Sequence, residues 1–511
     1  MITRDSRLPS LWQDTVDSFN STVTNSDAGN YDVLIVGGGI TGITTALMLQ
    51  QSGKNCLLLE AEELGYGTTG GTTAHLNTLL DTPYTTISKN FGKEAAITVA
   101  RATAEAIQLV KGNVAKYNID CGFVDAAAYL YAENEDQDKE LRDIFEATVE
   151  AGVSANMISE LPIPAMFTSV MRAEGQAKFH PLKYILVLAA EFEKAGGKLI
   201  QHCRVTNVED GANVTVETAV GSFSAKDLIY ATHIPPGINL LHLRCAPYRS
   251  YVMAGTLDDD NYPEDLVYDM YDPYFYYRTH EVDGQKMLIV GGKDHKTGHE
   301  ENTFRNYLQL EAKIKSLYPS FHLTHQWSSE FFEPADGLPY IGHLPQHTGH
   351  IHVATGFGGN GMVYSHISAM ILTDMLTGKE SRYGDLFNPK RIKPIAGFTN
   401  FIRHNADVTK EFLGKLFSAE KLTELSDLAA GEGKLVSFEG KKLGIYKAES
   451  GEITAVNPIC THMKCDVKWN TSERSWDCPC HGGRFDCYGK VLTGPPSHDL
   501  EQISIEQLIN K

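Results

Sequence analysis

Five of the nine cysteines in this 511-residue chain lie within 28 residues of one another near its C-terminal end. Two short motifs stand out among them, Cys460-x-His462 and Cys478-x-x-His481, with 15 residues between the motifs. Two thiolates can hold one iron of a [2Fe-2S] cluster while two imidazoles hold the other. The same four residues could also hold a tetrahedral zinc ion. In a chain that looks cytoplasmic, such crowding favours metal binding over disulfides.

The region around these motifs, about Leu435–Leu500, resembles Rieske [2Fe-2S] domains. Each motif carries a further cysteine, Cys465 in CTHMKC and Cys480 in CPCHGG, and Gly494-Pro495-Pro496 follows where Rieske proteins place a third, covering loop. These features count against zinc. The resemblance implies cluster ligation by the four residues Cys460, His462, Cys478 and His481.

The two further cysteines occupy positions that are bridged in Rieske proteins of cytochrome bc-type complexes. The resemblance therefore implies a disulfide between Cys465 and Cys480. Disulfides are unusual in the cytoplasm, so reduced thiols are the alternative. The chain departs from the bc-type proteins at Gly483 and Phe485, where those proteins have serine and tyrosine. Both hydroxyl donors to the cluster sulfurs are missing, which implies a lower reduction potential.

A glycine-rich turn, Gly37-x-Gly39-x-x-Gly42, joins the first predicted strand to a helix that begins at Ile40. In this arrangement the glycines allow a tight turn, close approach to a pyrophosphate and helix–strand packing. Glu60 ends the next predicted strand, where it can accept hydrogen bonds from a ribose hydroxyl. We therefore expect a dinucleotide site, and the alternative is a glycine turn with no ligand. The fingerprint alone does not distinguish NAD from FAD.

The position of the fingerprint favours FAD, because it follows the first strand and precedes a Thr- and Gly-rich segment, Gly65–Leu76. Here the body, about residues 31–385, resembles the D-amino-acid oxidase and glycine oxidase superfamily of FAD enzymes. Three later segments fit the superfamily in order. Arg204-Val205 lies at the end of a predicted strand where the superfamily contacts adenine, and Ile229–Thr232 matches its buried strand before a cofactor-facing turn. Asp336–Gly342, followed by Gly356–Met362, matches the C-terminal flavin motif of the superfamily.

The resemblance implies a set of FAD-binding residues drawn from all these segments. The set is Gly37, Gly39, Ile40, Gly42, Glu60, Thr68, Thr69, His75, Val205, Ala231, Gly356, Gly359, Asn360, Gly361 and Met362. Some relatives attach FAD covalently through a histidine in the region of His75. We expect FAD to be non-covalent here, with His75 as a hydrogen-bonding or packing residue.

Together these patterns predict the fold class. It is an α/β (α+β) FAD-binding body with a Rossmann-like βαβ unit and an antiparallel-sheet substrate domain, followed by a C-terminal all-β Rieske domain. The expected FAD-binding domain is discontinuous and spans residues 31–82, 174–240 and 334–385. The substrate domain spans 83–173 and 241–333, a helical connector spans 386–430, and the Rieske domain spans 431–511.

An aromatic stretch, Tyr268–Arg278, supplies the candidate substrate face. On a strand, Tyr274, Tyr276 and Arg278 point to one side, where aromatic rings could hold an amine by cation–π contact. The alternative is ordinary sheet packing. Amino-acid oxidases usually have an arginine that binds the substrate carboxylate, and glycine oxidase-like enzymes carry one just before the segment that corresponds to Asp336–Gly342. The residues at that place in this chain, Glu330–Pro334, include no arginine. This difference favours an amine or a larger substrate over a simple amino acid.

The net charge of −19, with no basic stripe, argues against nucleic-acid binding. The N-terminal 30 residues lack the basic-then-apolar pattern of a secretory signal, and no apolar run reaches the roughly 18 residues of a membrane span. A cytoplasmic location is the expectation.

The predicted function is that of an FAD-dependent oxidoreductase. We expect hydride transfer from an amine C–N unit to FAD and single-electron relay through the cluster to an external acceptor of unknown identity. The alternatives are an electron-transfer component that feeds a partner enzyme and a non-catalytic redox sensor. The sequence names no catalytic base, since such oxidations depend mainly on a neutral, well-placed amine.

Overall fold

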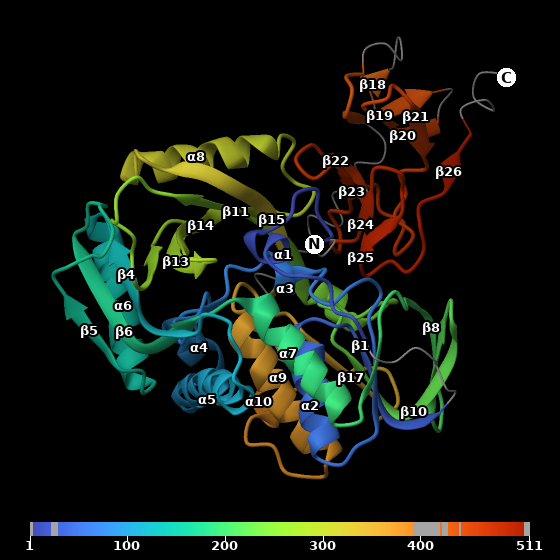
Figure 1. The fold of residues 1–511 in the computed structure, drawn as a ribbon, viewed down its shortest axis with the longest axis horizontal. Helices are drawn as coiled ribbons and strands as arrows, with labels where there is room; N and C mark the ends of the chain where they lie inside the picture. Colours follow the sequence, from blue (N-terminus) through green and yellow to red (C-terminus); the bar gives the residue numbers. More distant parts are fainter. Residues whose placement is uncertain (1–3, 22–28, 392–419, 422–427, 439–440, 505–511) are drawn as a thin grey trace.

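The computed structural model describes residues 4–21, 29–391, 420–421, 428–438 and 441–504. A large body of two sheets with helices on their faces carries a smaller all-β region at one end, drawn in red in Figure 1. This arrangement confirms the predicted fold class.

The first sheet is built around the predicted βαβ unit. Strand β1 (Asn30–Val36) leads through the glycine turn into α2 (Ile40–Gln51), and β2 (Cys56–Leu59) returns parallel to β1. The strand order is β16-β17-β10-β1-β2-β7. The remaining strands of this path are β7 (Lys198–Ile200), β10 (Gly221–Tyr230), β16 (Tyr340–His343) and β17 (Ile351–Thr355). Buried apolar side chains on both faces explain why these strands read as continuous apolar runs.

Helices α2, α7 (Pro181–Lys194) and α9 (Gly361–Leu376) pack side by side in the core of this domain. Helix α9 already starts at Gly361, within the glycine-rich segment Gly356–Met362. The prediction that Arg204-Val205 lies at the end of a strand was wrong. A turn at His202, whose φ is 53°, separates β7 from β8 (Val205–Asp210), so Val205 opens a strand.

Strand β8 forms a hairpin with β9 (Val214–Thr218) at the edge of the first sheet. The second sheet has nine strands in the order β15-β11-β14-β13-β12-β4-β6-β3, with β5 paired to β6. Helix α8 (Phe304–Leu317) packs on β11 and β14. The strands are β3 (His75–Leu76), β4 (Val124–Ala132), β5 (Ala155–Ile158), β6 (Ser169–Lys178), β11 (Cys245–Thr256), β12 (Leu266–Asp269), β13 (Tyr276–Val282), β14 (Gln285–Lys296) and β15 (His322–Pro334).

Two details of the second sheet bear on the sequence interpretation. Asp283 and Gly284, with φ of 50° and 80°, form the turn of the hairpin between β13 and β14. Strand β13 begins at Tyr276, so Tyr274 precedes it, and β6 runs across the predicted domain boundary at residue 174. The remaining helices of the body are α3 (Thr68–Gly71), α4 (Tyr84–Phe91), α5 (Lys93–Tyr117), α6 (Glu135–Glu150), η1 (Leu240–Leu243) and α10 (Gly384–Phe387).

The C-terminal region consists of two small sheets. One contains β18 (Glu420–Lys421), β19 (Gly433–Phe438), β20 (Lys441–Lys447), β21 (Ile453–Val456) and β26 (Gln502–Ile503). The other contains β22 (Lys468–Asn470), β23 (Ser475–Asp477), β24 (Arg484–Asp486) and β25 (Val491–Thr493). Most of the predicted connector, 386–430, lies outside the described residues.

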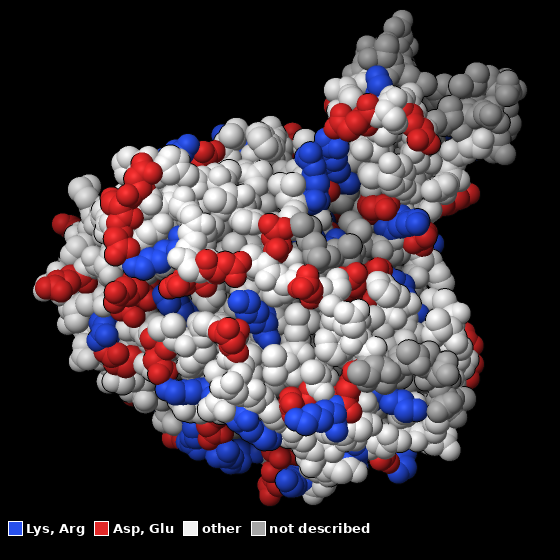
Figure 2. Space-filling model, viewed as in Figure 1, with Lys and Arg blue, Asp and Glu red and all other residues white. Residues whose placement is uncertain are grey.

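Within the described ranges, no helix combines the length and the apolar character that crossing a membrane requires. On the face drawn in Figure 2, acidic and basic side chains are interspersed over both the body and the C-terminal region. The described part of that face shows no continuous basic stripe.

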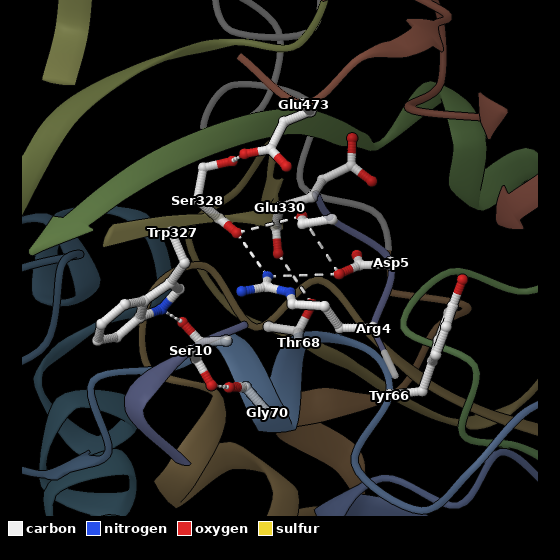
Figure 3. Close-up of polar contacts among 12 residues, drawn as sticks. Arg4, Asp5, Ser10, Tyr66, Thr68, Gly70, Trp327, Ser328, Glu330 and Glu473 are labelled. Carbon is white, nitrogen blue, oxygen red and sulfur yellow. Dashed lines mark hydrogen bonds and ion pairs between the residues drawn. The ribbon is translucent and has the colours of Figure 1, made fainter. Parts of the chain in front are cut away.

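The N-terminal segment joins the body to the C-terminal region (Figure 3). Arg4 donates to the carbonyl of Ser328 on β15 at 2.6 Å. The Ser10 hydroxyl, just before the short helix α1 (Leu11–Asp14), donates to the carbonyl of Gly70 in α3. The backbone N–H of Arg7 donates to Glu473, which also accepts from the Ser328 hydroxyl. This polar segment therefore contacts the loop after β2, strand β15 and the C-terminal region at once.

A buried ion-pair network closes the same interface. Arg484, which has no exposed surface, lies 3.3 Å from the carboxylate of Asp5 and 3.2 Å from that of Asp477. Burial acts to raise the pKa of Asp477, yet Arg484 and Arg249 hold it below its usual value. Charges buried this deeply are stable only while their partners are in place.

We expect Asp5→Ala to lower the free energy of unfolding by about 3–5 kcal/mol, because it leaves the buried guanidinium short of one partner. Urea unfolding measures the change. The matched control is Asp260→Ala, which removes an exposed pair with Lys286 and should leave the unfolding midpoint in place. Equal midpoints for Asp5→Ala and wild type would contradict this account of the interface.

Candidate functional site

One cavity of about 310 Å³ runs through the body and reaches the C-terminal region. Its walls come from the glycine turn after β1, the end of β2, the segment around α3, the face of the second sheet formed by β11–β15, and the start of α9. Residues 492–494 and 496–497 of the C-terminal region complete the wall. A volume in this range is typical of small-molecule and cofactor sites.

The fingerprint glycines fit closely into the backbone around one end of this cavity. A Cβ atom on Gly42 would lie 1.9 Å from the carbonyl oxygen of Gly37, and one on Gly37 would lie 2.4 Å from that of Ala231. Gly39 caps the N-terminus of α2, and the N–H of Ile40 donates to the Thr69 hydroxyl at 3.0 Å. The helix N-terminus thus opens towards the cavity, as pyrophosphate binding requires.

Glu60 lies beside this turn with its carboxylate held in place. It accepts hydrogen bonds from the backbone N–H of Gly38 at 2.5 Å and of Glu62 at 2.9 Å, while burial raises its pKa. Val205 lines the cavity nearby, and Arg204 forms an ion pair with Glu62 at 3.0 Å. This end therefore matches the part of the site expected to hold the adenosine.

The start of α9 forms another part of the wall, through Gly359, Asn360, Gly361 and Met362. Thr68, Thr69, His75 and Ala231 line the cavity as well. The structure does not bring every predicted residue to the wall: Gly42 and Gly356 lie behind it and contribute packing. A Cβ atom on Gly356 would lie 3.1 Å from the sulfur of Cys245.

One ring nitrogen of His75 has a hydrogen-bond partner, and the other has none among the described residues. Its Nδ1 lies 2.6 Å from the Tyr268 hydroxyl, and its buried Nε2 has no hydrogen-bond partner among the described residues. Burial and the nearby Arg278 lower the pKa of His75 well below its usual value, so the ring is neutral. An orphaned buried nitrogen on the cavity wall fits a cofactor that supplies the missing partner.

The predicted substrate face is only partly assembled at the cavity. Tyr274 and Tyr276 line it together with Tyr268. Arg278 lies elsewhere: it is fully buried and donates to the carbonyls of Thr73 and Ala74 at 2.7 and 2.8 Å. Its guanidinium is therefore occupied by the backbone and is not part of the described cavity wall.

Three carboxylates to which the sequence assigned no role also line the cavity: Asp81, Asp294 and Glu330. Burial raises the pKa of all three, to about 7 for Asp294 and about 8 for Glu330. Each stands alone in its segment of sequence, so no local spacing pattern marks it. Asp294 is brought to the cavity by strand β14, and Asp81 by the loop between β3 and α4.

The four predicted cluster ligands converge in the C-terminal region. The thiols of Cys460 and Cys478 are hydrogen-bonded to each other, and the rings of His462 and His481 lie 5.2 Å apart. Both nitrogens of the buried His481 ring lack a hydrogen-bond partner among the described residues. Paired thiols beside paired imidazoles, with an orphaned ring, fit a [2Fe-2S] cluster held by two cysteines and two histidines.

A disulfide between Cys465 and Cys480 ties the two ligand loops together, as the resemblance implied. The covering loop packs on these loops through Pro496. A Cβ atom on Gly483 would lie 2.7 Å from the Pro496 ring and 3.6 Å from the sulfur of Cys460. The serine that bc-type proteins carry at this position would therefore require Pro496 to move.

The ligand loops also contact the body directly. His462 Nε2 lies 3.0 Å from the carbonyl oxygen of Gly237, and the ring of His242 lies 4.6 Å from His462 and 5.5 Å from His481. Ile234 and Pro236, immediately before Gly237, line the cavity. The cavity and the cluster loops are thus separated by a single segment of the body on one side and by the covering loop on the other.

Comparison with known proteins places these features in context. The FAD dependent oxidoreductase family matches residues 32–375, and the Rieske [2Fe-2S] domain family matches residues 419–504. YhfW of Bacillus subtilis (strain 168), named as a Rieske 2Fe-2S iron-sulfur protein, is 34% identical over 479 residues, which cover 93% of this chain and 94% of YhfW.

Two further proteins match the body. Gamma-glutamylputrescine oxidoreductase of Escherichia coli (strain K12) is 24% identical over 391 residues, covering 73% of this chain and 88% of its own. The crystal structure of glycine oxidase from Geobacillus kaustophilus superposes with a TM-score of 0.60 at 18% identity, covering 71% of this chain and 99% of that one. At 18% identity, the similarity to glycine oxidase is a similarity of fold alone.

We expect acid precipitation to release FAD into the supernatant, because His75 is a neutral ring held by Tyr268 and serves as a hydrogen-bonding neighbour of the cofactor. His75→Gln should still bind FAD, with weaker retention during gel filtration. Flavin absorbance of pellet and supernatant is the measurement. Colour that stays in the wild-type pellet but leaves that of His75→Gln would show a covalent bond to His75.

Phe485→Tyr should raise the potential of the [2Fe-2S] cluster. Phe485 lies in the same buried cluster as Cys460 and Cys478, and a hydroxyl that bonds a ligand thiolate stabilises the more negative, reduced state. A hydrogen bond to a charged group corresponds to roughly 60–130 mV for one electron. Protein-film voltammetry measures the shift, and Phe485→Leu is the control without a donor. An unchanged potential in Phe485→Tyr would refute the hydrogen-bond explanation.

Proposed function

This chain belongs to the FAD dependent oxidoreductase family and carries a Rieske [2Fe-2S] domain, and from this premise we propose that it oxidises an amine at a C–N bond. Its cofactors are FAD and a [2Fe-2S] cluster. When bound, FAD takes up two electrons from the substrate and the cluster passes them singly to an external acceptor. The expected domain boundaries and a cytoplasmic location are further parts of this proposal.

The proposal assigns the predicted residues as follows. Cys460, His462, Cys478 and His481 hold the cluster. Gly37, Gly39, Ile40 and the start of α9 bind FAD through backbone N–H groups, Glu60 accepts from the ribose, and Val205 and Ala231 bound the cofactor. Tyr274 and Tyr276 form the substrate wall.

The observation that carries the proposal is that the predicted FAD-binding residues and the covering loop of the predicted cluster site line one cavity. The covering loop contributes Gly494 and Pro496 to the wall, and Pro496 packs against Gly483 beside the sulfur of Cys460. Two redox cofactors on either side of this loop could exchange electrons without a partner protein. A redox sensor with a degenerate flavin site would need no such shared wall.

An amine is favoured by the charges on the wall. Among the described residues that line the cavity, the basic side chains are Arg204 and two histidines, and Arg204 is paired with Glu62. A simple amino acid would present its carboxylate to this wall without a guanidinium to bind it. The name of the Escherichia coli relative, an oxidoreductase of gamma-glutamylputrescine, supports an amine substrate as well.

Anaerobic titration of the purified holoenzyme with a panel of amines and amino acids tests the proposal. We expect amines to bleach the flavin absorbance, after which the electron paramagnetic resonance signal of the reduced cluster develops. Glycine and sarcosine should be much poorer reductants. Cys478→Ser, which removes one cluster ligand, is the control: its flavin should bleach with no cluster signal.

Other outcomes would support other functions. Flavin reduction by NADH or a partner protein alone, with every amine inactive, would indicate an electron-transfer component. Purified protein that holds a cluster but no FAD would favour a redox sensor.

A further inference from the structure

The substrate end of the cavity contains two carboxylates among aromatic rings. Asp294, near the end of β14, and Asp81, in the loop before α4, line it with Tyr268, Tyr274 and Tyr276. The assignments above give neither carboxylate a role. The two differ sharply in how their oxygens are satisfied.

Asp81 is fully engaged by the protein. It accepts hydrogen bonds from the Tyr274 hydroxyl at 3.0 Å and from the backbone N–H of Gly359 at 2.6 Å. Its own N–H donates to the side chain of Asn360 at 2.9 Å. Asp81 therefore fastens the loop at the start of α9 to the tyrosine wall and has a positioning role.

Asp294, by contrast, has one carboxylate oxygen that the described residues leave without a hydrogen bond. Its Oδ1 is buried and has no hydrogen-bond partner among the described residues. Ser250 lies beside the carboxylate of Asp294, and its hydroxyl lies 2.7 Å from that of Tyr276. A buried carboxylate oxygen without a partner is costly, and a cationic ligand in the cavity would remove that cost.

The surrounding rings suit a cation as well. The ring centroids of Tyr274 and Tyr276 lie 5.6 Å apart, and those of Tyr268 and Tyr274 lie 6.4 Å apart. The neutral His75 adds a fourth ring, 5.8 Å from that of Tyr276. Aromatic faces around a carboxylate are the ordinary recognition chemistry of an organic ammonium ion.

We propose that Asp294 binds the ammonium group of the substrate and accepts one proton from it, which makes Asp294 the catalytic base of the reaction. One N–H bond breaks, one O–H bond forms on Asp294, and the charges of the pair cancel without any change in oxidation state. The nitrogen keeps a lone pair, so the neighbouring carbon can be oxidised. This inference rests on the proposed function and narrows its substrate class to ammonium compounds with no carboxylate beside the reacting nitrogen.

The groups around Asp294 are suited to this exchange. Burial raises the pKa of Asp294 to about 7, and the carboxylates of Asp81, Glu333 and Asp272 act in the same direction while Ser250 opposes them. The other titratable groups facing it are Tyr274 and Tyr276, whose pKa values burial raises, and both stay protonated. The base form of Asp294 is present above its pKa, so the second-order rate constant for flavin reduction should rise with pH through about 7.

Binding is tested first with tetramethylammonium, a cation that has no proton to give. Calorimetric titration of the oxidised holoenzyme should show binding, and Asp294→Asn should weaken it by about tenfold or more. Asp260→Asn is the matched control, because Asp260 is exposed, lies outside the described cavity wall and is not among the charges that act on Asp294, and it should bind as wild type does. No binding to wild type, or equal binding to Asp294→Asn, would overturn the cation site.

Proton transfer is tested by stopped-flow reduction of the flavin with an amine from the panel above. Asp294→Asn should lose the limb of the pH profile near 7 and reduce its flavin about a hundredfold more slowly, while it retains FAD. A limb near pH 7 in both proteins would refute the base. If no amine reduces wild-type flavin, the proposed function fails, and the tetramethylammonium titration still decides whether Asp294 forms a cation site.

Discussion

The buried guanidinium of Arg484 is the interaction on which the rest of this structure depends. It lies between a carboxylate from the N-terminal segment, Asp5, and one from the neighbouring strand, Asp477. A charge without solvent must be matched by its partners, so the C-terminal region, the N-terminal segment and β15 can only be buried together. The position of the cluster loops on the body follows from this requirement.

The cavity depends on the same assembly. Its wall at the cluster end comes from the covering loop, and the α3 segment that lines it is fixed by the N-terminal residues through Ser10 and Gly70. Residues far apart in the chain thus enclose one compartment between two cofactor sites. Undocking the C-terminal region would open the cavity to water and separate the sites at once.

Much of this could be predicted because the signals are local. The glycine turn after β1 and the two Cys/His motifs each lie within a few residues, and short-range sterics and ligand spacing determine them. Val205 was assigned to the wrong end of a strand because the turn at His202 carries no glycine or proline. Asp294 could not be recognised, since its role arises from contacts with Ser250 and the tyrosines of other strands. The role of the N-terminal segment could not be recognised either, because partners such as Ser328 and Glu473 lie more than 300 residues away.

Gly482 occupies a narrow space against the body: a Cβ atom there would lie 2.7 Å from Pro247 and 2.8 Å from the carboxylate of Glu330. Together with the contact of His462 with Gly237, this packing leaves the ligand loops no room to rotate on the body. For the electron relay proposed above, this packing implies a fixed distance and a first-order transfer between the two sites. The rate of such a transfer would be independent of solvent viscosity and of protein concentration, and only the meeting with an external acceptor would be governed by diffusion.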